Sequence, residues 1–462
     1  MSSGNAAEAR ADADATGATP TAPPRAPTRG EAFRYWFRLG WISFGGPAGQ
    51  IAIMHRELVD EKRWISEARF LHALNFCMLL PGPEATQLAT YIGWLMHRTW
   101  GGLVAGILFV LPSLAVLIAL SWVYLAFGRV PAVAGLLYGI KPAVVAIVLH
   151  AAWRIGTRAL KHPLLWLLAA AAFVAIFAFA VPFPAIVLGA AIAGALGGRY
   201  APRAFAASGA HGVRSRAHPP ALIDDATPTP PHARYTPSRL AKVIGTFLLL
   251  WAAALGALTL RFGWDGALTQ MGWFFTKAAL LTFGGAYAVL PYVYQGAVES
   301  YGWLTPGQMI DGLALGETTP GPLIMVVAFV GFVGNVTRGL DGETLLAVGA
   351  AGACVATFFT FLPSYLFILA GGPMVESTHG QLRFTAPLTG ITAAVVGVIV
   401  NLAAFFAWHV FAPGGAPGPV DFVAIAITAL AAIALFRYKV GVIPVIVGCG
   451  LIGLALGTLR GA

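Results

Sequence analysis

The segment FGGPAGQ, residues 44–50, recurs in the second part of the chain as FGGAYAV at 283–289. In each copy a tryptophan follows the phenylalanine after 20 residues, and a Pro-Gly-Pro triplet begins 17 residues later, at 81–83 or 320–322. Identical spacing over about forty residues indicates an internal repeat. The two parts of the chain are therefore copies of one unit.

The repeat continues beyond these motifs. Leu111-Pro112-Ser113 matches Leu-Pro-Ser at 362–364, and Ala-Val-Val at 143–145 matches Ala-Val-Val at 394–396, at one common offset. Thirteen apolar segments are long enough, or nearly so, to cross a bilayer, and a polar, Pro-rich stretch at 200–240 separates six of them from the other seven. The FGG and Pro-Gly-Pro motifs fall in four of these segments, at 33–54, 71–96, 272–297 and 309–334.

Composition fixes the broad class. The 462 residues are 58% hydrophobic and 10% charged, with a mean hydropathy of +0.76. A soluble core cannot absorb so much apolar surface, so the sequence predicts an all-α polytopic membrane protein with about 12–13 membrane segments. The expected domains are a disordered arm at 1–30, a first repeat at 31–199, a linker at 200–240, a connecting span at 241–271 and a second repeat at 272–462.

The odd number of segments before the second copy predicts halves in inverted orientation. With a cytoplasmic amino terminus and linker, the inside loops hold 19 Lys or Arg residues and the outside loops 8. This bias follows the positive-inside rule and explains the net charge of +10 without a nucleic acid partner. Four of the outside residues lie in the loop at 55–70, which moves inside if the first segment is a re-entrant hairpin.

Glycine and proline together interrupt a helix, and in lipid the freed backbone groups need a partner. Matched interruptions in two halves of a repeat point to the central site of a transporter. Unpaired N–H groups at the start of a broken helix suit an anion, so the motifs predict an oxyanion cradle; alternatively, the glycines only permit close packing and the prolines only kink. The candidate substrate-binding residues are Phe44, Gly45, Gly46, Pro47, Gln50, Pro81, Gly82, Pro83, Glu84, Gln87, Phe283, Gly284, Gly285, Pro320, Gly321 and Pro322.

Charged residues within apolar segments are the second group of candidates. Glu84, Glu317, Lys141 and Lys277 are candidates for charge or proton coupling, because a carboxylate beside an anion site repels the ligand unless it is protonated. The alternatives are structural pairing of Lys with Glu and lysines that extend to the interface.

The sequence predicts no cofactor, metal or catalytic residue. The three cysteines are far apart, and the histidines lack the spacing of a zinc site. Nucleotide-binding and nucleophile motifs are absent from the sequence, so an ion gradient or passive flow is the expected source of energy.

The blocks FGGPAGQIAIMHRELVDEKRWIS and WLTPGQMIDGLALGETTPGPLIMV resemble the chromate transporter family in its long, two-domain form. The likeness covers about 33–459, with the arm and linker outside it. It implies chromate export across the bacterial inner membrane, driven by the proton-motive force, and chromate resistance. The second copy has Ala286 in place of Pro47 and Leu323 in place of Glu84, which predicts one dominant site with unequal contributions.

Three alternatives remain open at this point. A sulfate or other oxyanion permease would share the same build, since chromate and sulfate are both tetrahedral dianions. A membrane enzyme acting on lipid phosphate would need a nucleophile or metal cluster, and a passive channel would not accumulate its substrate. The expected partners are chromate, with sulfate as an alternative, protons and membrane lipid, and a homodimer is one open possibility for the assembly.

Overall fold

The computed structural model describes residues 24–44, 46–205, 220–224, 227–228, 230–339, 344–377, 385–413 and 419–460. In these ranges the regular structure is helical, apart from one isolated bridge between Ile65 and Ile223. The helices of the first half are α2 (Arg29–Ile42), α3 (Gly46–His55), the π-helix η1 (Arg56–Glu61), α4 (Glu67–Leu79), α5 (Glu84–Phe127), α6 (Pro131–Ala159), α7 (Pro163–Phe179), α8 (Phe183–Tyr200) and α9 (Pro202–Phe205).

The second half repeats this order after a short 3-10 turn, η2 (Pro231–Ala233), and one additional long helix, α10 (Pro237–Phe262). Even the π-helix recurs at the same offset. The helices are α11 (Ala267–Leu280), α12 (Ala286–Tyr294), the π-helix η3 (Gln295–Ser300), α13 (Pro306–Thr318), the 3-10 turn η4 (Leu323–Met325), α14 (Val326–Thr337), α15 (Leu345–Ser377), α16 (Thr385–Phe411), α17 (Phe422–Phe436) and α18 (Val442–Arg460).

Helix α5 consists of two helical parts separated by a kink. His97 and Arg98 have non-helical backbone angles, so the first part, 84–96, turns into a long second part, 99–127. These two parts correspond to α14 and α15 of the second half, where a loop joins them instead.

Four short helical segments at the start of the first half form two hairpins that enter from one face. The first hairpin consists of α2 and α3, and the second of α4 and the first part of α5. Pro27 precedes α2, and its carbonyl oxygen lies 3.1 Å from Nε2 of His97 at the kink in α5. The loop after η1 pairs with the linker through Ile65 and Ile223, and His232 of the linker contacts the Trp94 carbonyl oxygen. We call the face where the linker contacts the hairpins the linker face. Each hairpin therefore begins and ends at the linker face and turns back inside the protein.

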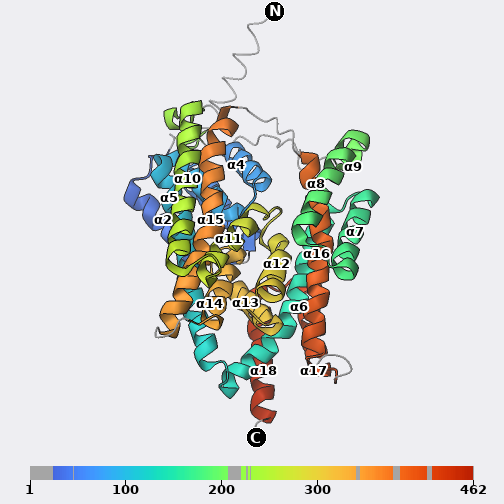
Figure 1. Cartoon of the computed structure of the whole chain (residues 1–462). Coiled ribbons are helices and arrows are strands. Elements are labelled where there is room, and N and C mark those ends of the chain that lie inside the picture. The colour runs from blue at the N-terminus through green and yellow to red at the C-terminus, as the bar shows by residue number, and fades with distance from the viewer. Residues whose placement is uncertain are drawn as a thin grey trace, which may run out of the picture.

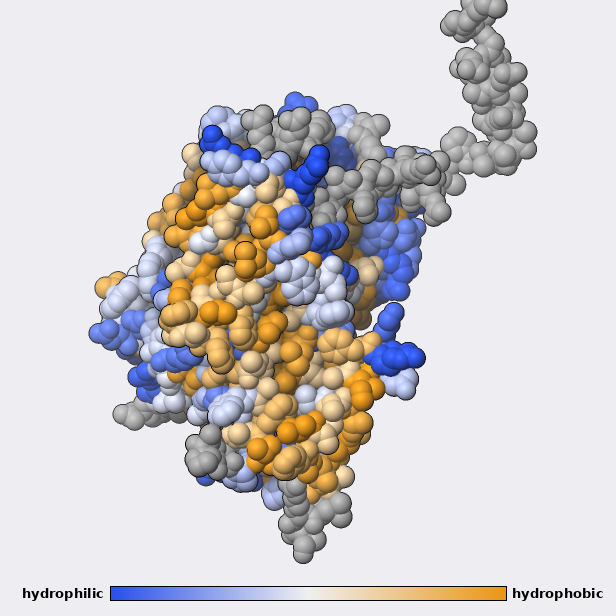
Figure 2. Space-filling model, turned by 90° about the vertical axis from the view of Figure 1, so that its right-hand side faces the viewer, coloured by the Kyte–Doolittle hydropathy of each residue, from blue (hydrophilic) through white to orange (hydrophobic). Residues whose placement is uncertain are grey.

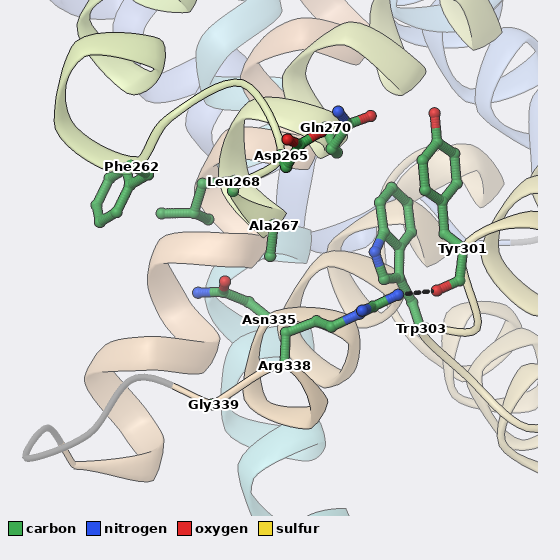
Figure 3. Close-up of a pocket in the computed structure, with 11 residues that line it drawn as sticks. Phe262, Asp265, Ala267, Leu268, Gln270, Tyr301, Trp303, Asn335, Arg338 and Gly339 are labelled. Atoms are coloured by element: carbon green, nitrogen blue, oxygen red, sulfur yellow. Dashed lines mark hydrogen bonds between the residues drawn. The ribbon is translucent and has the colours of Figure 1, made fainter.

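The corresponding hairpins of the second half enter from the opposite face. Figure 3 shows the start of α11 beside the residues that follow η3 and the end of α14, around a cavity lined by Leu268, Trp303 and Arg338. Arg338 donates a hydrogen bond to the Tyr301 carbonyl oxygen and ties the two hairpins together. The two halves are thus inverted, as the repeat and the odd segment count predict.

Six helices are long and apolar enough to cross a membrane, and four shorter apolar helices accompany them, all within the described residues. Apolar side chains cover the middle of the face shown in Figure 2, while hydrophilic ones gather toward its upper rim. The six long spans are Glu84–Phe127, Pro131–Ala159, Phe183–Tyr200, Pro237–Phe262, Leu345–Glu376 and Ala386–Phe411.

The helices pack in two groups (Figure 1). In the first group, α2 packs against α5, α11 and α14 pack against α15, and α5 and α15 pack against each other. In the second, α6 contacts α16, α17 and α18, and α16 contacts α7 and α8. The helices α12 and α13 lie at mid-depth between the groups.

The segments 33–54, 71–96, 272–297 and 309–334 carry the predicted breaks, which the sequence leaves open between broken spans and re-entrant helices, and each is a re-entrant hairpin. Hydropathy cannot distinguish a single span from two half-length helices of the same composition. The loop at 55–70 therefore lies at the linker face, and it brings four basic residues to that face: Arg56, Lys62, Arg63 and Arg69.

Candidate functional site

The helix interruptions of one half are hydrogen-bonded to those of the other half through the backbone. The Gly82 N–H donates to the Thr282 carbonyl oxygen over 2.7 Å, and the Gly321 N–H donates to the Ser43 carbonyl oxygen over 2.8 Å. Ser43 and Thr282 directly precede the two FGG motifs, so each Pro-Gly-Pro triplet meets the FGG element of the other half. We call this crossing of four breaks the junction.

Only glycine fits at the central position of each Pro-Gly-Pro triplet. Gly82 has φ +129° and Gly321 has φ +93°, conformations that L side chains rarely adopt. A Cβ atom on Gly82 would lie 2.4 Å from Ser364 Oγ, and one on Gly321 would lie 2.9 Å from Ser113 Cβ. Both serines belong to the Leu-Pro-Ser repeats of the opposite half, so the close approach is itself a repeated feature.

The junction corrects one expectation. Ser43 and Thr282 follow the carboxyl ends of α2 and α11, where carbonyl oxygens lack helical partners. The amides of Gly82 and Gly321 satisfy two of these oxygens and are therefore not free to bind an anion. The negative ends of α2 and α11 are capped across the repeat, and the positive ends of the following helices remain for a ligand.

A cavity of about 510 Å³ begins at the junction and extends toward the linker face. The amino-terminal residues of α3, α5 and α12 line it, together with α4 and the carboxyl-terminal part of α6. Its lining consists of Pro47, Ala48, Ile51, Leu74, Met78, Glu84, Arg154, Ile155, Arg158, Ala159, Gly284, Gly285, Ala286, Tyr287 and Thr392.

Backbone geometry directs α12 at this cavity. Gly284 and Gly285 have φ values of +79° and +95°, and the helix begins at Ala286 without a side-chain cap. The first N–H groups of a helix have no intrahelical acceptor and carry the positive end of its dipole. With α3 and α5, three helix amino termini line one cavity, an arrangement suited to an anion.

Two arginines supply full positive charge. Arg154 and Arg158 are four residues apart on α6 and therefore lie on one face of it. Arg154 is half-buried and Arg158 is exposed. Guanidinium groups match the oxygens of carboxylate or phosphate-like anions through paired N–H donors. The cavity can therefore hold an oxyanion by charge and by hydrogen bonds.

Sequence reasoning missed both arginines because it ended the preceding segment at 153 and left them in a loop. The structure continues α6 to Ala159. The signal that could have found them is their i, i+4 spacing directly after an apolar helix.

One carboxylate lines the cavity, and a second lies behind a residue that lines it. Glu84 is the first residue of α5 and lines the cavity. Glu317 lies at the end of α13 and accepts a hydrogen bond from the hydroxyl of Tyr287, which also lines the cavity. The Glu317 carboxylate interacts electrostatically with Arg154. The cavity thus combines anion-binding groups with two groups that can carry protons.

The predicted site residues divide between the cavity and the junction. Pro47, Glu84, Gly284 and Gly285 line the cavity. The Gln50 side chain donates to the Gly321 carbonyl oxygen over 2.5 Å. Those at or next to the junction are Phe44, Gly46, Gln50, Pro81, Gly82, Pro83, Gln87, Phe283, Pro320, Gly321 and Pro322, and Gly45 lies outside the described residues.

The two predicted lysines lie away from the cavity. Lys141 Nζ is 3.3 Å from a carboxylate oxygen of Asp311 near the start of α13, whereas the cavity lies beyond the other end of that helix. Lys277 Nζ is 5.6 Å from the ring centroid of Trp273. Lys141 is therefore paired, with Asp as its partner rather than the Glu considered from the sequence.

Buried hydroxyls at the junction were not singled out from the sequence. Ser43, Thr86, Ser113 and Ser364 are buried, and their side-chain oxygens have no hydrogen-bond partner among the described residues. Buried polar groups of this kind are rare outside functional sites. Across the described part of the chain, no cluster of three or more His, Cys, Asp or Glu residues could hold a metal ion.

Inverted helical halves, broken helices and a charged cavity at their crossing are the features of membrane transporters built from inverted repeats. The family model for the chromate transporter matches residues 30–195 and 269–454, one region in each half. The chain belongs to the chromate transporter family and is a multi-pass membrane protein.

Curated relatives match over most of their length. The chain is 33% identical over 453 residues to a chromate transport protein of Pseudomonas aeruginosa, covering 95% of each chain. It is 32% identical over 392 residues to a chromate transport protein of Cupriavidus metallidurans, covering 84% of this chain and 85% of the relative. No solved structure matches the chain.

Proposed function

We propose that this protein exports chromate from the bacterial cytoplasm across the plasma membrane, with the proton-motive force as the driving force. The observation that carries the proposal is the junction cavity, where Arg154 and Arg158 meet the amino termini of three broken helices. The names of the curated relatives identify chromate as the oxyanion.

Charge supports a dianion as the substrate. Transfer of two negative charges into a low-dielectric site costs many kcal/mol unless they are paired. Two guanidinium groups supply matching charge, and helix amino termini supply N–H donors at the far end of the cavity. Sulfate has the same shape and charge as chromate, so a sulfate or other oxyanion permease is the second candidate function.

Orientation follows from the hairpins. Arg56, Lys62, Arg63 and Arg69 lie at the face to which the linker binds. The positive-inside rule then favours a cytoplasmic linker and amino terminus. The cavity, which extends toward that face, is in this reading open to the cytoplasm, where an exporter takes up its substrate.

Glu84 is the proposed proton carrier. Its carboxylate lies in the same cavity as the two arginines. An ionised Glu84 and a bound dianion repel each other, so binding of one proton favours binding of the anion. Proton and anion then cross in the same direction, and the membrane potential, the electrical part of the proton-motive force, drives export because the protonated carrier with bound dianion keeps a net negative charge.

The test is chromate uptake by energised everted membrane vesicles, whose outer surface is the cytoplasmic one. We expect accumulation against the chromate gradient, with weaker competition by excess sulfate. Uptake that stops at equilibrium would indicate a channel and overturn the proposal. Accumulation of sulfate with no response to chromate would favour the second candidate.

A further inference from the structure

The hairpin helices pack differently at the linker face and at the opposite face of the protein. At the face opposite the linker, α12 packs against α16 and α13 packs against α6. Tyr294 of α12 packs against Phe405 of α16, with 4.4 Å between the ring centroids and the ring planes tilted by 51°. Their repeat counterparts, α3 and α4, instead line the cavity and face α6 across it. The cavity thus separates α3 and α4 from α6 at the linker face, whereas α12 and α13 contact the second helix group at the opposite face, where a further cavity of about 570 Å³ adjoins Tyr294 and Phe405.

An inverted repeat allows the opposite state to be described from this one. If each half adopts the arrangement that the other now has, α3 and α4 close against the second helix group and α12 and α13 separate from it. The cavity residues of one state then indicate, position by position, the residues that line the cavity of the other.

When the two halves exchange arrangements, Lys141 occupies the position that a cavity-lining residue has in the present state. The Ala-Val-Val repeats align 143–145 with 394–396, and the same offset aligns Lys141 with Thr392. Thr392 lines the present cavity, and its Oγ1 lies 3.7 Å from the Cβ position of Gly284. In the opposite state Lys141 is therefore placed beside the first-half FGG element, where it can contact an anion.

In the present state an ion pair holds Lys141. Its Nζ lies 3.3 Å from Oδ2 of Asp311, and the Tyr124 hydroxyl donates to the same oxygen over 2.9 Å. Asp311 is buried, at 2% exposure. Because Lys141 is on α6 and Asp311 is on α13, the pair joins two helices that must separate for the opposite face to open.

We propose that Lys141 is the anion-binding cation of the state open to the face opposite the linker, and that its pair with Asp311 locks that face shut in the present state. This inference depends on the proposed transport function. On opening, the substrate anion replaces Asp311 as the partner of Lys141, so the ammonium is not left unpaired. The substrate thereby stabilises the open state more than the closed one, as a ligand must to shift the equilibrium.

Cysteine labelling tests the lock without any transport. Leu290 of α12 is fully buried and is the repeat counterpart of Ile51, which lines the present cavity. We choose Leu290→Cys and Ile51→Cys as reporters, each with Cys77, Cys354 and Cys449 replaced by alanine. A membrane-impermeant maleimide is applied from the face that each reporter monitors, in intact cells and in everted vesicles.

Asp311→Asn removes one partner of a buried pair, which shifts a conformational equilibrium by about tenfold. We expect labelling of Leu290→Cys to rise by about this factor and labelling of Ile51→Cys to fall. Asp421→Asn is the matched control, because Asp421 accepts a hydrogen bond from Tyr138 within the second helix group and does not bridge the groups. Equal labelling of Leu290→Cys in Asp311→Asn and its parent would overturn the lock.

A second arm tests the anion contact. In the Asp311→Asn background, we expect chromate to speed labelling of Leu290→Cys, by stabilising the open state, when Lys141 is present and when it is replaced by arginine. Lys141→Met should abolish this increase. An equal increase in Lys141→Met would overturn the assignment of Lys141. If the unmodified protein moves no chromate in everted vesicles, the proposed function fails, whereas the result with Asp311→Asn alone still decides the lock.

Discussion

The backbone N–H of Gly82 in the first half donates to the Thr282 carbonyl oxygen in the second, and Gly321 forms the reciprocal bond with Ser43. These two bonds fix the relative positions of four broken helices with no side chain between them. They also occupy the carbonyl ends of α2 and α11, so the field at the crossing is set by helix amino termini. The proposed anion site therefore depends on a contact between the halves, and neither half contains it alone.

Alanine at either junction glycine should destabilise the protein. A Cβ atom on Gly82 would lie 2.4 Å from Ser364 Oγ and 2.6 Å from Gln87 Nε2, in a buried site. We expect Gly82→Ala to lower the free energy of unfolding by about 2 kcal/mol or more, through overpacking and the positive φ. Thermal unfolding in detergent measures the change.

Gly245→Ala is the control for this prediction. Gly245 lies within α10 and has no atom within 4 Å of its Cβ position. Alanine there should be neutral or slightly stabilising, because it favours the helix. Equal melting temperatures for Gly82→Ala and Gly245→Ala would contradict the proposed tightness of the junction.

Removal of the Arg154 charge should weaken chromate binding. Hydrogen bonds to charged groups contribute about 1.5–3 kcal/mol, so we expect Arg154→Gln to raise KM for chromate by about tenfold or more. Arg158 is more exposed, and its charge is better screened by water, so Arg158→Gln should have a smaller effect. Initial rates of uptake in everted vesicles over a range of chromate concentrations measure both.

Arg129→Gln tests whether loss of any basic residue has the same effect. Arg129 is exposed in the turn between α5 and α6, at the face opposite the linker. Its replacement should leave KM unchanged. A KM for Arg154→Gln within twofold of the parent would remove Arg154 from the site.

Glu84→Gln should separate transport from the proton gradient. The amide keeps the shape of the side chain but binds no proton and does not repel a dianion. We expect uptake by the parent to fall when an ionophore collapses the membrane potential and to rise when one collapses the pH gradient alone, because the acidic vesicle interior opposes entry of the proton that accompanies chromate. Uptake by Glu84→Gln should be insensitive to the pH gradient. Glu299→Gln, at an exposed position on η3, is the control. The same fractional rise in Glu84→Gln and the parent would assign the coupling elsewhere.

The repeat and the breaks could be predicted from the sequence, because glycine and proline at fixed spacing have local consequences for the backbone. Phe44-Gly45-Gly46 and its copy interrupt helices wherever they occur. The partner of each break could not be predicted. The bond from Gly82 to Thr282 joins residues 200 positions apart, and no local propensity encodes which of four similar breaks meet.

The charged residues of the cavity show a second limit of prediction from hydropathy. Arg154 and Arg158 follow the apolar run of α6, so hydropathy assigns them to a loop, although a helix once formed continues through charged residues that line a cavity. Lys141 shows the reverse. Its charge inside an apolar segment was visible in the sequence, but its partner Asp311 lies on a hairpin that hydropathy reads as a span.

Acid should release the linker from the first-half hairpins. The His232 imidazole donates a hydrogen bond to the Trp94 carbonyl oxygen over 2.9 Å and packs edge-on against the Trp94 ring. Burial lowers the pKa of His232 below its ordinary value of 6.5, and the charges of Arg98 and Arg239 act in the same direction, while the hydrogen bond to Trp94 opposes them. Docking therefore favours the neutral ring.

The sign of the pH dependence follows directly. Docking is complete above the ordinary pKa and weakens as the pH falls through the lowered pKa of the docked state, since protonation then favours the undocked linker. Hydrogen-exchange protection factors for residues 220–224 and 230–233, compared between neutral and acidic pH, measure the release. His232→Gln keeps a hydrogen-bond donor without the titration, so its protection should not change with pH. A parallel loss of protection in this variant would assign the pH response to another group, whereas loss in the parent alone would show that one histidine couples acidity at the linker face to the hairpins that carry the junction.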